Sequence, residues 1–504
     1  MPTAQINGKE VSVPPGTPII RAAALVGFNI PHFCYHPALS APANCRMCLV
    51  ELEGRPKLEP ACYLKVEDGM KIQTESARVI AARKAVLEFI LINHPVDCPI
   101  CDQAGECKLQ DYYMAYDAQP SRLQTAKVAK AKVYPIGPEV VYDGERCILC
   151  TRCVRFCDQI TGTSELTVVE RGDHSEIRTF PGRELDNAYS MNVTDICPVG
   201  ALTTRDFRFK CRVWLLTSTD SVCTGCAKGC SIHLEHFQGE VQRYRPRFNP
   251  EVNEYWMCDA GRLSYRELHT NRLTTLRVGD DATLSWPRAA RKVATDLKAR
   301  ATDGSRTAFV ASAQASTETL FAAHAWATQV LGAEQLYWAG RPDGGSDSFL
   351  VSADKNPNRA GVVATFGEAI ATRDVSQLLA ALEAGSIDTL VFMGSELGLP
   401  AEQQALLVEL AGNLRHLVVV TSHRSELSDR AHVVLPLATH AEDDGTFINE
   451  DGIVQPFQCA YAPRGESLPG WQIFARLARG AGSELTASTL DAIQSALFAD
   501  SAAE

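Results

Sequence analysis

The cysteines of this chain are gathered almost entirely in its first half, and they constrain its fold more than any other feature. Seventeen of the 18 cysteines precede Gly261, and only Cys459 follows it. They occur in tight groups within a chain of 504 residues. Disulfide scaffolds are short and secreted, whereas the opening MPTAQINGKEVSVPPG lacks the apolar core expected of a signal peptide. The grouping therefore predicts metal or cluster ligation rather than disulfides.

Charge and hydropathy exclude two classes of partner. The chain carries 49 Lys and Arg against 60 Asp and Glu, a formal net charge of −11, which argues against nucleic acid as the main partner. We find no apolar run long enough for a transmembrane helix, so membrane attachment is expected only through partner proteins. The length predicts roughly three or four domains.

The first segment, residues 1–75, is expected to be a small β-rich domain. The alternating pattern TAQINGKEVSV predicts a hairpin that turns at Asn7 and Gly8. In the segment that follows, Thr17 is the expected N-cap of a helix, and Pro18 is its expected first residue. We therefore expect one helix packed on a small sheet.

The first segment also contains four cysteines with the spacing C-x10-C-x2-C-x13-C. Plant-type 2Fe-2S sites combine a close C-x2-C pair with more distant cysteines on loops. A structural zinc site could use the same ligands. The loop at 37–43 is rich in Pro and Ala and follows a β-grasp-like segment, which favours a 2Fe-2S cluster. The predicted ligands are Cys34, Cys45, Cys48 and Cys62.

The segment 76–135 is expected to hold a second ligand group after a helix over residues 76–93. Its motif HPVDCPICDQAGEC contains His94, Cys98, Cys101 and Cys107. Zinc remains open on spacing alone. In a 4Fe-4S cluster, an imidazole in place of a thiolate leaves the site less negative and raises its potential. The polar stretch that follows is predicted to be a solvated linker, with a docking patch as the alternative; its cations are Arg122, Lys127, Lys130 and Lys132.

The segment 136–215 contains the run C-x2-C-x2-C-x3-C, which is typical of bacterial ferredoxins. Only one further Cys-Pro pair lies nearby, so five thiols are available for one cluster. We predict a 4Fe-4S site formed by three close cysteines and one distant cysteine, with Cys157 left over as a buried thiol. The predicted ligands are Cys147, Cys150, Cys153 and Cys197.

The segment 216–272 holds a fourth group with the spacing C-x2-C-x3-C-x27-C, for which a zinc ribbon is the alternative to a 4Fe-4S cluster. A hairpin turning at Gly239 is expected between its last two members. Four consecutive cluster sites predict an electron relay. The unassigned thiols, Cys157, Cys211 and Cys459, are expected to be small buried hydrophobes. The predicted ligands of the fourth site are Cys223, Cys226, Cys230 and Cys258.

The segment 273–504 alternates strand-like and helical runs, which predicts a parallel sheet covered by helices. The whole chain is thus expected to be multidomain, α+β in its first half and α/β in its second. It contains no G-x-G-x-x-G or P-loop motif, so nothing argues for a nucleotide site. The acidic run of Glu442, Asp443 and Asp444 is expected to form an exposed loop.

Four strings of the chain resemble the large iron–sulfur subunit of NADH–quinone oxidoreductase, respiratory complex I: FCYHPALSAPANCRMCLVE, HPVDCPICDQAGECKLQDYY, ERCILCTRCVRFCDQITGTSEL and NVTDICPVGALT. The resemblance covers residues 1 to about 215 and implies the three N-terminal ligand sets named above, with Cys157 outside them. Ala43 and Met191 stand where we expect glycine. Residues 223–262 look like the 4Fe-4S segment of molybdopterin oxidoreductases, which implies a fourth cluster away from the main electron route.

The second half is also similar to molybdopterin enzymes, in the string DRAHVVLPLATHAEDDGTFINEDGIVQ. Because the chain after Cys258 is short for enclosing two pterins, we expect a degenerate molybdopterin-oxidoreductase-like domain without molybdenum cofactor. It is expected to serve as a scaffold and docking surface. A molybdenum assay would separate this expectation from an intact formate dehydrogenase.

The resemblance implies an electron-relay subunit without catalytic residues of its own. It implies one 2Fe-2S and three 4Fe-4S clusters, a partner subunit carrying FMN and the NADH site, and other peripheral-arm partners leading toward quinone. It also implies a peripheral location on the cytoplasmic side of the bacterial inner membrane, with protons translocated by membrane partners. Electrons are expected to enter at the His94 site and leave from the Cys147 site, with the 2Fe-2S centre exchanging electrons between them. The alternatives are an NAD-linked formate dehydrogenase, a hydrogenase and a zinc scaffold.

Overall fold

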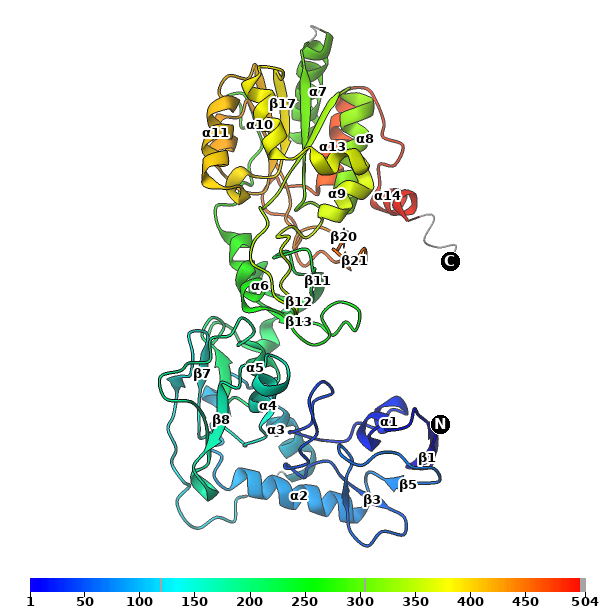
Figure 1. Ribbon diagram of the computed structural model, residues 1–504, viewed down its shortest axis with the longest axis vertical. Coiled ribbons are helices and arrows are strands. Elements are labelled where there is room, and N and C mark those ends of the chain that lie inside the picture. Colours follow the sequence, from blue (N-terminus) through cyan, green and yellow to red (C-terminus); the bar gives the residue numbers. More distant parts are fainter. Residues whose placement is uncertain (118–119, 303–304, 499–504) are drawn as a thin grey trace. The chain divides into compact units, whose positions relative to one another are not determined.

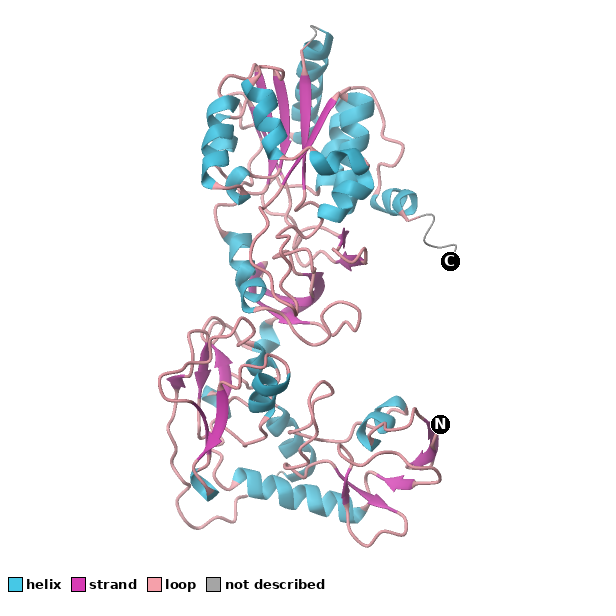
Figure 2. Cartoon of the chain, in the orientation of Figure 1, coloured by secondary structure: helices cyan, strands magenta, loops and turns pink. Residues whose placement is uncertain are grey.

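The computed structural model describes residues 1–117, 120–302 and 305–498, and the chain forms two compact units, Met1–Leu216 and Thr217–Glu504 (Figure 1). The architecture is multidomain, with mixed α+β structure in the first unit and an α/β sheet in the second (Figure 2). Among the helices that the structure describes, none combines the length and hydropathy needed to cross a membrane.

The first unit begins with a five-stranded sheet in the order β2-β1-β5-β3-β4. The predicted hairpin is confirmed, because Asn7 and Gly8 both have positive φ, 48° and 83°, as a tight two-residue turn requires. Apolar side chains of helix α1 close the core of this sheet. The elements are β1 Thr3–Ile6, β2 Lys9–Ser12, α1 Ile19–Leu25, β3 Leu49–Leu52, β4 Glu59–Pro60 and β5 Lys71–Gln73.

The start of helix α1 differs by one residue from the expectation. Pro18, expected as its first residue, is instead its N-cap, with φ −64° and ψ 146°. Thr17 therefore lies one position before the N-cap, and its hydroxyl donates to the Pro14 carbonyl at 2.7 Å.

Helix α2, Ala77–Leu91, confirms the predicted helix and ends three residues before His94. Its N-cap is Ser76, whose hydroxyl accepts from the Val79 amide. At its other end, the Lys127 ammonium donates at 2.8 Å to the carbonyls of Leu91 and Ile92.

The stretch after α2 is solvated, as expected, because residues 121–133 form no helix or strand and Arg122, Lys127 and Lys132 are exposed, but its cations also bind the chain. The C-terminal carbonyls of a helix have no intrahelical partners, so a nearby cation binds them. The other three cations of the stretch also bind the chain: Arg122 pairs with Glu88, Lys130 donates to the Ser175 carbonyl, and Lys132 pairs with Asp97 and Glu145.

The rest of the first unit consists of short elements that hold long loops in place. A three-stranded sheet has the order β10-β7-β6, and β8 and β9 form a separate antiparallel pair. The loops carry most of the predicted ligand cysteines, whereas Cys98 begins η1 and Cys153 lies in α4. The elements are η1 Cys98–Ile100, α3 Lys108–Tyr112, η2 Tyr113–Asp117, β6 Tyr134–Pro135, β7 Val140–Tyr142, α4 Arg152–Gln159, β8 Leu166–Val169, η3 Gly172–His174, β9 Glu176–Thr179, α5 Asn192–Asp195, β10 Leu202–Thr204 and η4 Val213–Leu215.

The second unit opens with an antiparallel sheet in the order β11-β12-β13. The hairpin expected at Gly239 is confirmed, and Gln238 and Gly239 form its turn with φ of 52° and 78°. Two short helices follow the sheet. The elements are β11 Thr217–Val222, β12 Ser231–Phe237, β13 Glu240–Pro246, α6 Asp259–Leu263 and η5 Ser264–His269.

The larger part of the second unit is a six-stranded sheet in the order β14-β19-β18-β17-β15-β16. Its five strands from β19 to β16 are parallel, which confirms the predicted parallel sheet, and only the edge strand β14 is antiparallel. The strands are β14 Arg277–Val278, β15 Thr307–Ser312, β16 Gln335–Ala339, β17 Thr389–Met393, β18 His416–Thr421 and β19 Val433–Pro436.

Helices cover both faces of this sheet (Figure 1). Strand β15 alternates between two cores: Phe309 faces α7, α8 and α13, whereas Val310 faces α10 and α11. The remaining elements are α7 Trp286–Thr302, α8 Thr317–Ala325, η6 Trp326–Val330, α9 Arg359–Phe366, η7 Glu368–Thr372, α10 Val375–Glu383, η8 Glu396–Gly398, α11 Ala401–Ala411, α12 Glu426–Arg430, β20 Gly445–Ile448, β21 Val454–Phe457, α13 Gly470–Gly480 and α14 Leu490–Leu497.

Candidate metal centres

The four cysteines of the first group come together beneath the N-terminal sheet. Three of them, Cys34, Cys48 and Cys62, are no more than 1% exposed. The backbone amide of Cys34 donates to the Cys45 sulfur at 3.4 Å. Hydrogen bonds among the thiols lower the pKa of Cys34 and Cys48 and raise the pKa of Cys45 and Cys62. The thiols therefore face one another and can share one cluster.

The loop that brings Cys45 to this site has a strained conformation. Ala43 and Arg46 have positive φ of 54° and 58°. Glycine adopts this left-handed region without steric cost, which explains why glycine is expected at Ala43. Met191, the other position where glycine is expected, has an ordinary φ of −68°.

The second group lies where α2 ends and α3 begins. His94, Cys98 and Cys107 line a cavity of about 800 Å³. The Nδ1 atom of His94 is buried and has no hydrogen-bond partner, and burial lowers the pKa of this imidazole to about 4. A neutral imidazole with an unpaired nitrogen can donate its lone pair to a metal. This observation fits the predicted ligand role of His94.

The sulfur of the fourth member of the second group, Cys101, packs against the backbone of a glycine, Gly200. A Cβ atom at Gly200 would lie 2.4 Å from the Cys101 sulfur, so only glycine fits there. Arg212 donates to the carbonyls of Cys101 and Pro99 at 2.8 and 2.6 Å.

A buried ion pair also holds the loop of the second group. Arg146 binds Asp97 through two hydrogen bonds of 3.0 and 2.6 Å, and the Arg146 side chain is 4% exposed. Asp97 stands directly before Cys98, so the pair fixes the chain at the first thiol. Sequence patterns missed this role of Arg146, because Asp97 lies 49 residues away.

The third group surrounds a small internal cavity lined by all four of its predicted ligands, Cys147, Cys150, Cys153 and Cys197, and also by Tyr142. Burial raises the pKa of Cys150 to about 11 and of Cys197 to about 12. Metal ligation needs thiolates, so binding of a cluster would release protons here. Tyr142 accepts from the Ile177 amide at 3.1 Å and hydrogen-bonds to Cys147, a partner that spacing could not reveal.

Cys157 does not line this cavity, although it lies one helical turn beyond Cys153 on α4. It is fully buried, as expected of a leftover thiol, and burial together with the charge of Glu165 raises its pKa to about 12. The expectation of burial does not hold for the other unassigned thiols. Cys211 is half-buried and Cys459 is exposed.

The fourth group lies between β11 and α6. The amide of Cys223 donates to the Cys230 carbonyl at 2.9 Å, and the amide of Gly261 donates to the Cys258 sulfur at 3.3 Å. A Cβ atom at Gly261 would lie 2.9 Å from the Cys223 sulfur. The fourth member, Cys226, is 8% exposed. Because Gly261 has no side chain, the space in front of the Cys223 and Cys258 sulfurs stays open.

Within the part of the chain that the structure describes, no three His, Cys, Asp or Glu side chains are placed to hold one metal ion. The four groups are instead recognised by the burial of their thiols, the cavities that they line and the contacts of their sulfur atoms.

The third group adjoins the second at Pro198, the residue after Cys197. The Cys107 thiol approaches the Pro198 carbonyl at 3.9 Å, and the Lys108 amide donates to the same carbonyl at 3.1 Å.

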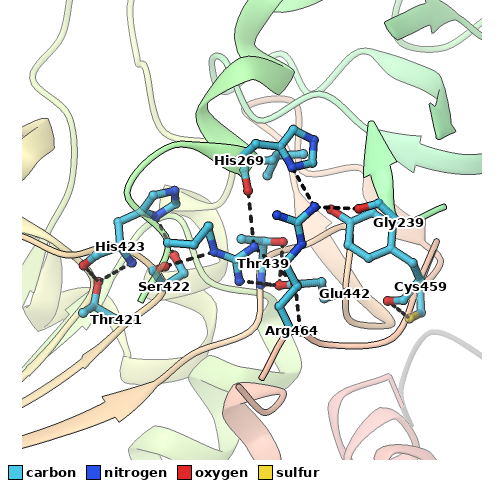
Figure 3. A network of polar contacts seen from close by, with 12 residues as sticks. Gly239, His269, Thr421, Ser422, His423, Thr439, Glu442, Cys459 and Arg464 are labelled. Atoms are coloured by element: carbon cyan, nitrogen blue, oxygen red, sulfur yellow. Dashed lines mark hydrogen bonds and ion pairs between the residues drawn. The ribbon is translucent and has the colours of Figure 1, made fainter. Parts of the chain in front are cut away.

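The acidic run in the second unit is mostly buried, so the expectation of an exposed loop is wrong. Glu442 is 1% exposed, and its carboxylate accepts from both terminal nitrogens of Arg272 at 3.2 and 2.6 Å (Figure 3). It also accepts from Thr439 and from the Arg464 amide. Only Asp444 is exposed. A buried carboxylate needs such partners, and Arg272 lies 170 residues away, beyond the reach of local patterns.

Asp443, 8% exposed, makes the stability of the second unit depend on pH. Burial, reinforced by the charge of Glu318, raises its pKa to about 8. A raised pKa stabilises the fold below the ordinary carboxyl range, and this contribution is lost as pH rises through about 8. We expect Asp443→Asn to remove a slope of about 1.4 kcal/mol per pH unit between pH 5 and 7. Urea unfolding at both values measures it, and an unchanged slope in the variant would contradict the assignment.

A cavity of about 530 Å³ lies at the carboxyl ends of the parallel strands. Its lining includes Ser312 at the end of β15, Gly394 after β17 and Ser422 after β18. Open α/β sheets bind ligands at this edge. The absence of a molybdenum cofactor from this cavity stays a prediction, which a molybdenum assay would test.

Five family models match the chain. Their order along the sequence follows the ligand groups described above. They are a 2Fe-2S iron-sulfur cluster binding domain over residues 2–77, the NADH-ubiquinone oxidoreductase-G iron-sulfur binding region over 83–122, the ferredoxin-like domain of NADH-quinone oxidoreductase subunit 3 over 137–203, the NADH-ubiquinone oxidoreductase NDSU1/NuoG-like 4Fe-4S domain over 216–266, and molybdopterin oxidoreductase over 355–480.

Curated relatives are similar to more than half of the chain. An NADH-quinone oxidoreductase subunit of Streptomyces coelicolor is 42% identical over 304 residues, which cover 59% of this chain and 36% of that one. The NADH-ubiquinone oxidoreductase 75 kDa subunit of Reclinomonas americana is 43% identical over 296 residues, covering 58% and 43%. The chain thus spans less than half the length of these relatives.

A solved NAD+-reducing [NiFe]-hydrogenase chain is 27% identical and covers 42% of this chain and 90% of its own. The TM-score of this match is 0.38.

Proposed function

The chain is a homologue of the large iron–sulfur subunit of NADH–quinone oxidoreductase, and we propose that it serves as the electron-relay subunit of such a complex. The observation that carries the proposal is the arrangement of 15 cysteines and His94 in four groups, buried or half-buried, within the first 258 residues. When bound, iron–sulfur clusters supply one-electron transfer without a substrate site.

The chain's own residues hold and shield the clusters in this proposal. Cys34, Cys45, Cys48 and Cys62 hold a 2Fe-2S cluster, and the other three groups hold 4Fe-4S clusters. Imidazole ligation by His94 makes its site less negative than an all-thiolate site. The surrounding burial excludes water from the thiolates. The ligands of the 4Fe-4S sites are His94, Cys98, Cys101 and Cys107; Cys147, Cys150, Cys153 and Cys197; and Cys223, Cys226, Cys230 and Cys258.

The contacts within the first unit support an order of sites different from the expected one. The Cys147 group adjoins the second group through Cys107 and Pro198. It adjoins the first group through the side-chain amide of Asn44, whose Nδ2 donates to the Leu149 carbonyl at 3.4 Å. We therefore replace the path that enters at His94 by one in which the Cys147 group connects the other two.

The proposal includes partners that the chain itself does not contain. Hydride must become single electrons before it enters clusters, and flavins perform that conversion. We propose an FMN-bearing NADH-oxidising partner, further peripheral-arm partners toward quinone, and proton translocation by membrane partners. The proposed location is peripheral, at the cytoplasmic face of the bacterial inner membrane.

The alternative functions make different metal predictions. A zinc scaffold would contain zinc and be colourless, and a formate dehydrogenase would contain molybdenum or tungsten. A hydrogenase would hold an additional active cluster, so its metal content would exceed that of the four groups.

The test is the metal content of the full chain purified without oxygen. We expect about 14 iron atoms per chain, matching acid-labile sulfide, and no stoichiometric zinc or molybdenum. EPR after dithionite reduction should show both 2Fe-2S and 4Fe-4S signals. About 10 iron atoms would mean that one 4Fe-4S site is empty. Stoichiometric zinc without iron would overturn the relay, and stoichiometric molybdenum would make the second unit an active site.

A further inference from the structure

An arginine of helix α4 joins the first and third cysteine groups directly. One nitrogen, Nη2 of Arg155, donates to the Cys34 carbonyl at 2.6 Å and to the Cys150 carbonyl at 3.3 Å. The other terminal nitrogen, Nη1, donates to the Ser40 carbonyl. Arg155 is only 9% exposed. A single guanidinium nitrogen therefore connects a predicted ligand of the 2Fe-2S site with one of the Cys147-containing 4Fe-4S site.

A second arginine on the same helix makes a parallel connection. Arg152 donates through Nη2 to the carbonyl of Tyr35, which follows Cys34 in the chain. Through Nη1 it donates at 3.0 Å to the carbonyl of Ile196, which precedes Cys197. Two guanidinium groups thus bind backbone next to the ligands of both sites.

The charge of these arginines has no carboxylate to balance it. Among the described residues, neither Arg152 nor Arg155 lies within ion-pair distance of an Asp or Glu. A buried cation is costly unless an anion compensates it. Four thiolates outweigh the positive charge of an iron–sulfur core, so both occupied sites would be anionic. The clusters on either side are the anions that the two arginines would face.

We propose that Arg155, assisted by Arg152, is a positioning residue shared by the 2Fe-2S site and the Cys147-containing site. Its carbonyl contacts fix the two ligand loops beside each other. Its charge stabilises the reduced form of both clusters, because reduction adds one negative charge on either side of the guanidinium. This inference rests on the proposed function, since it requires both clusters to be present.

The test is an EPR-monitored redox titration of the full iron-loaded chain and of three variants. Arg155→Gln removes the charge and should lower both midpoint potentials. We expect at least a tenfold fall in each reduction equilibrium constant, which is about 59 mV for a one-electron couple. Arg155→Lys keeps the charge but not the forked contacts, and its potentials should return toward those of the wild type.

Gln159→Ala is the matched control, because Gln159 joins Ser40 in the same contact region through bonds of 2.7 and 2.9 Å without a charge. Its potentials should equal those of the wild type. Unchanged potentials in iron-loaded Arg155→Gln, or an equal fall in Arg155→Lys, would overturn the proposal. If Arg155→Gln loses iron, Arg152→Gln is titrated in its place. A fall in both midpoint potentials would then support the proposal, and unchanged potentials would overturn it. Absence of the 2Fe-2S or 4Fe-4S signal in the wild type would instead contradict the proposed function.

Discussion

Replacing Cys153 by alanine should remove one whole 4Fe-4S cluster, while the same change at Cys157 should remove none. Cys153 lines the internal cavity with Cys147, Cys150 and Cys197, whereas Cys157 lies one turn further along α4, outside the lining. A 4Fe-4S cluster that lacks one of its four protein ligands is held less tightly and dissociates from the chain. The iron content should therefore fall from about 14 to about 10 atoms in Cys153→Ala.

The two variants form a closely matched pair, since both remove a buried thiol from the same helix. Cys153 is 7% exposed and Cys157 is fully buried. Iron and sulfide analysis, with EPR of the reduced chain, measures the outcome. Loss of iron in Cys157→Ala together with full iron in Cys153→Ala would exchange the roles of these cysteines. Far-UV circular dichroism shows whether either variant remains folded.

Replacing Glu442 by alanine should destabilise the second unit by about 3–5 kcal/mol. The change leaves Arg272, whose side chain is 5% exposed, as a buried cation without its partner. It also removes the acceptor of Thr439 and of the Arg464 amide. Urea unfolding followed by tryptophan fluorescence measures the loss, because five of the six tryptophans lie in the second unit.

Three comparisons separate the ion pair from a general effect of substitution. Glu402→Ala, at an exposed position of α11, should change the free energy of unfolding by less than about 0.5 kcal/mol. The double variant Glu442→Ala, Arg272→Ala should lose less than the sum of the single variants. Additive losses would show that the two side chains do not interact.

The third comparison is the pH dependence of the Glu442 contribution. Burial alone would raise the pKa of Glu442, but hydrogen bonds from Arg272 and Thr439 leave it below the ordinary value. A lowered pKa adds stability above the ordinary carboxyl range, and this stability is lost as pH falls through the folded-state pKa. The difference between wild type and Glu442→Gln should therefore shrink on acidification, opposite in sign to the effect of Asp443.

Local spacing was sufficient to propose the ligand groups and to predict many of the elements that the structure confirms. The run around Cys147, the hairpin at Asn7 and Gly8, and the parallel strands of the second unit all depend on residues close together in the chain. Turn chemistry and strand patterning act over a few residues, so a single sequence displays them. The expected cap at Thr17 was wrong because the helix begins one residue later, with Pro18 as its N-cap.

The sequence by itself determined which residues could hold clusters, since ligand chemistry follows from residue type and close spacing. Only the tertiary structure decided what surrounds them. The partners of Arg155, Arg146 and Glu442 lie tens to hundreds of residues away, at Cys34, Asp97 and Arg272. Burial turned an acidic run that is ordinarily solvated into an ion-paired centre. These contacts arise from packing of distant segments, and no local pattern records which distant group will neutralise a buried charge.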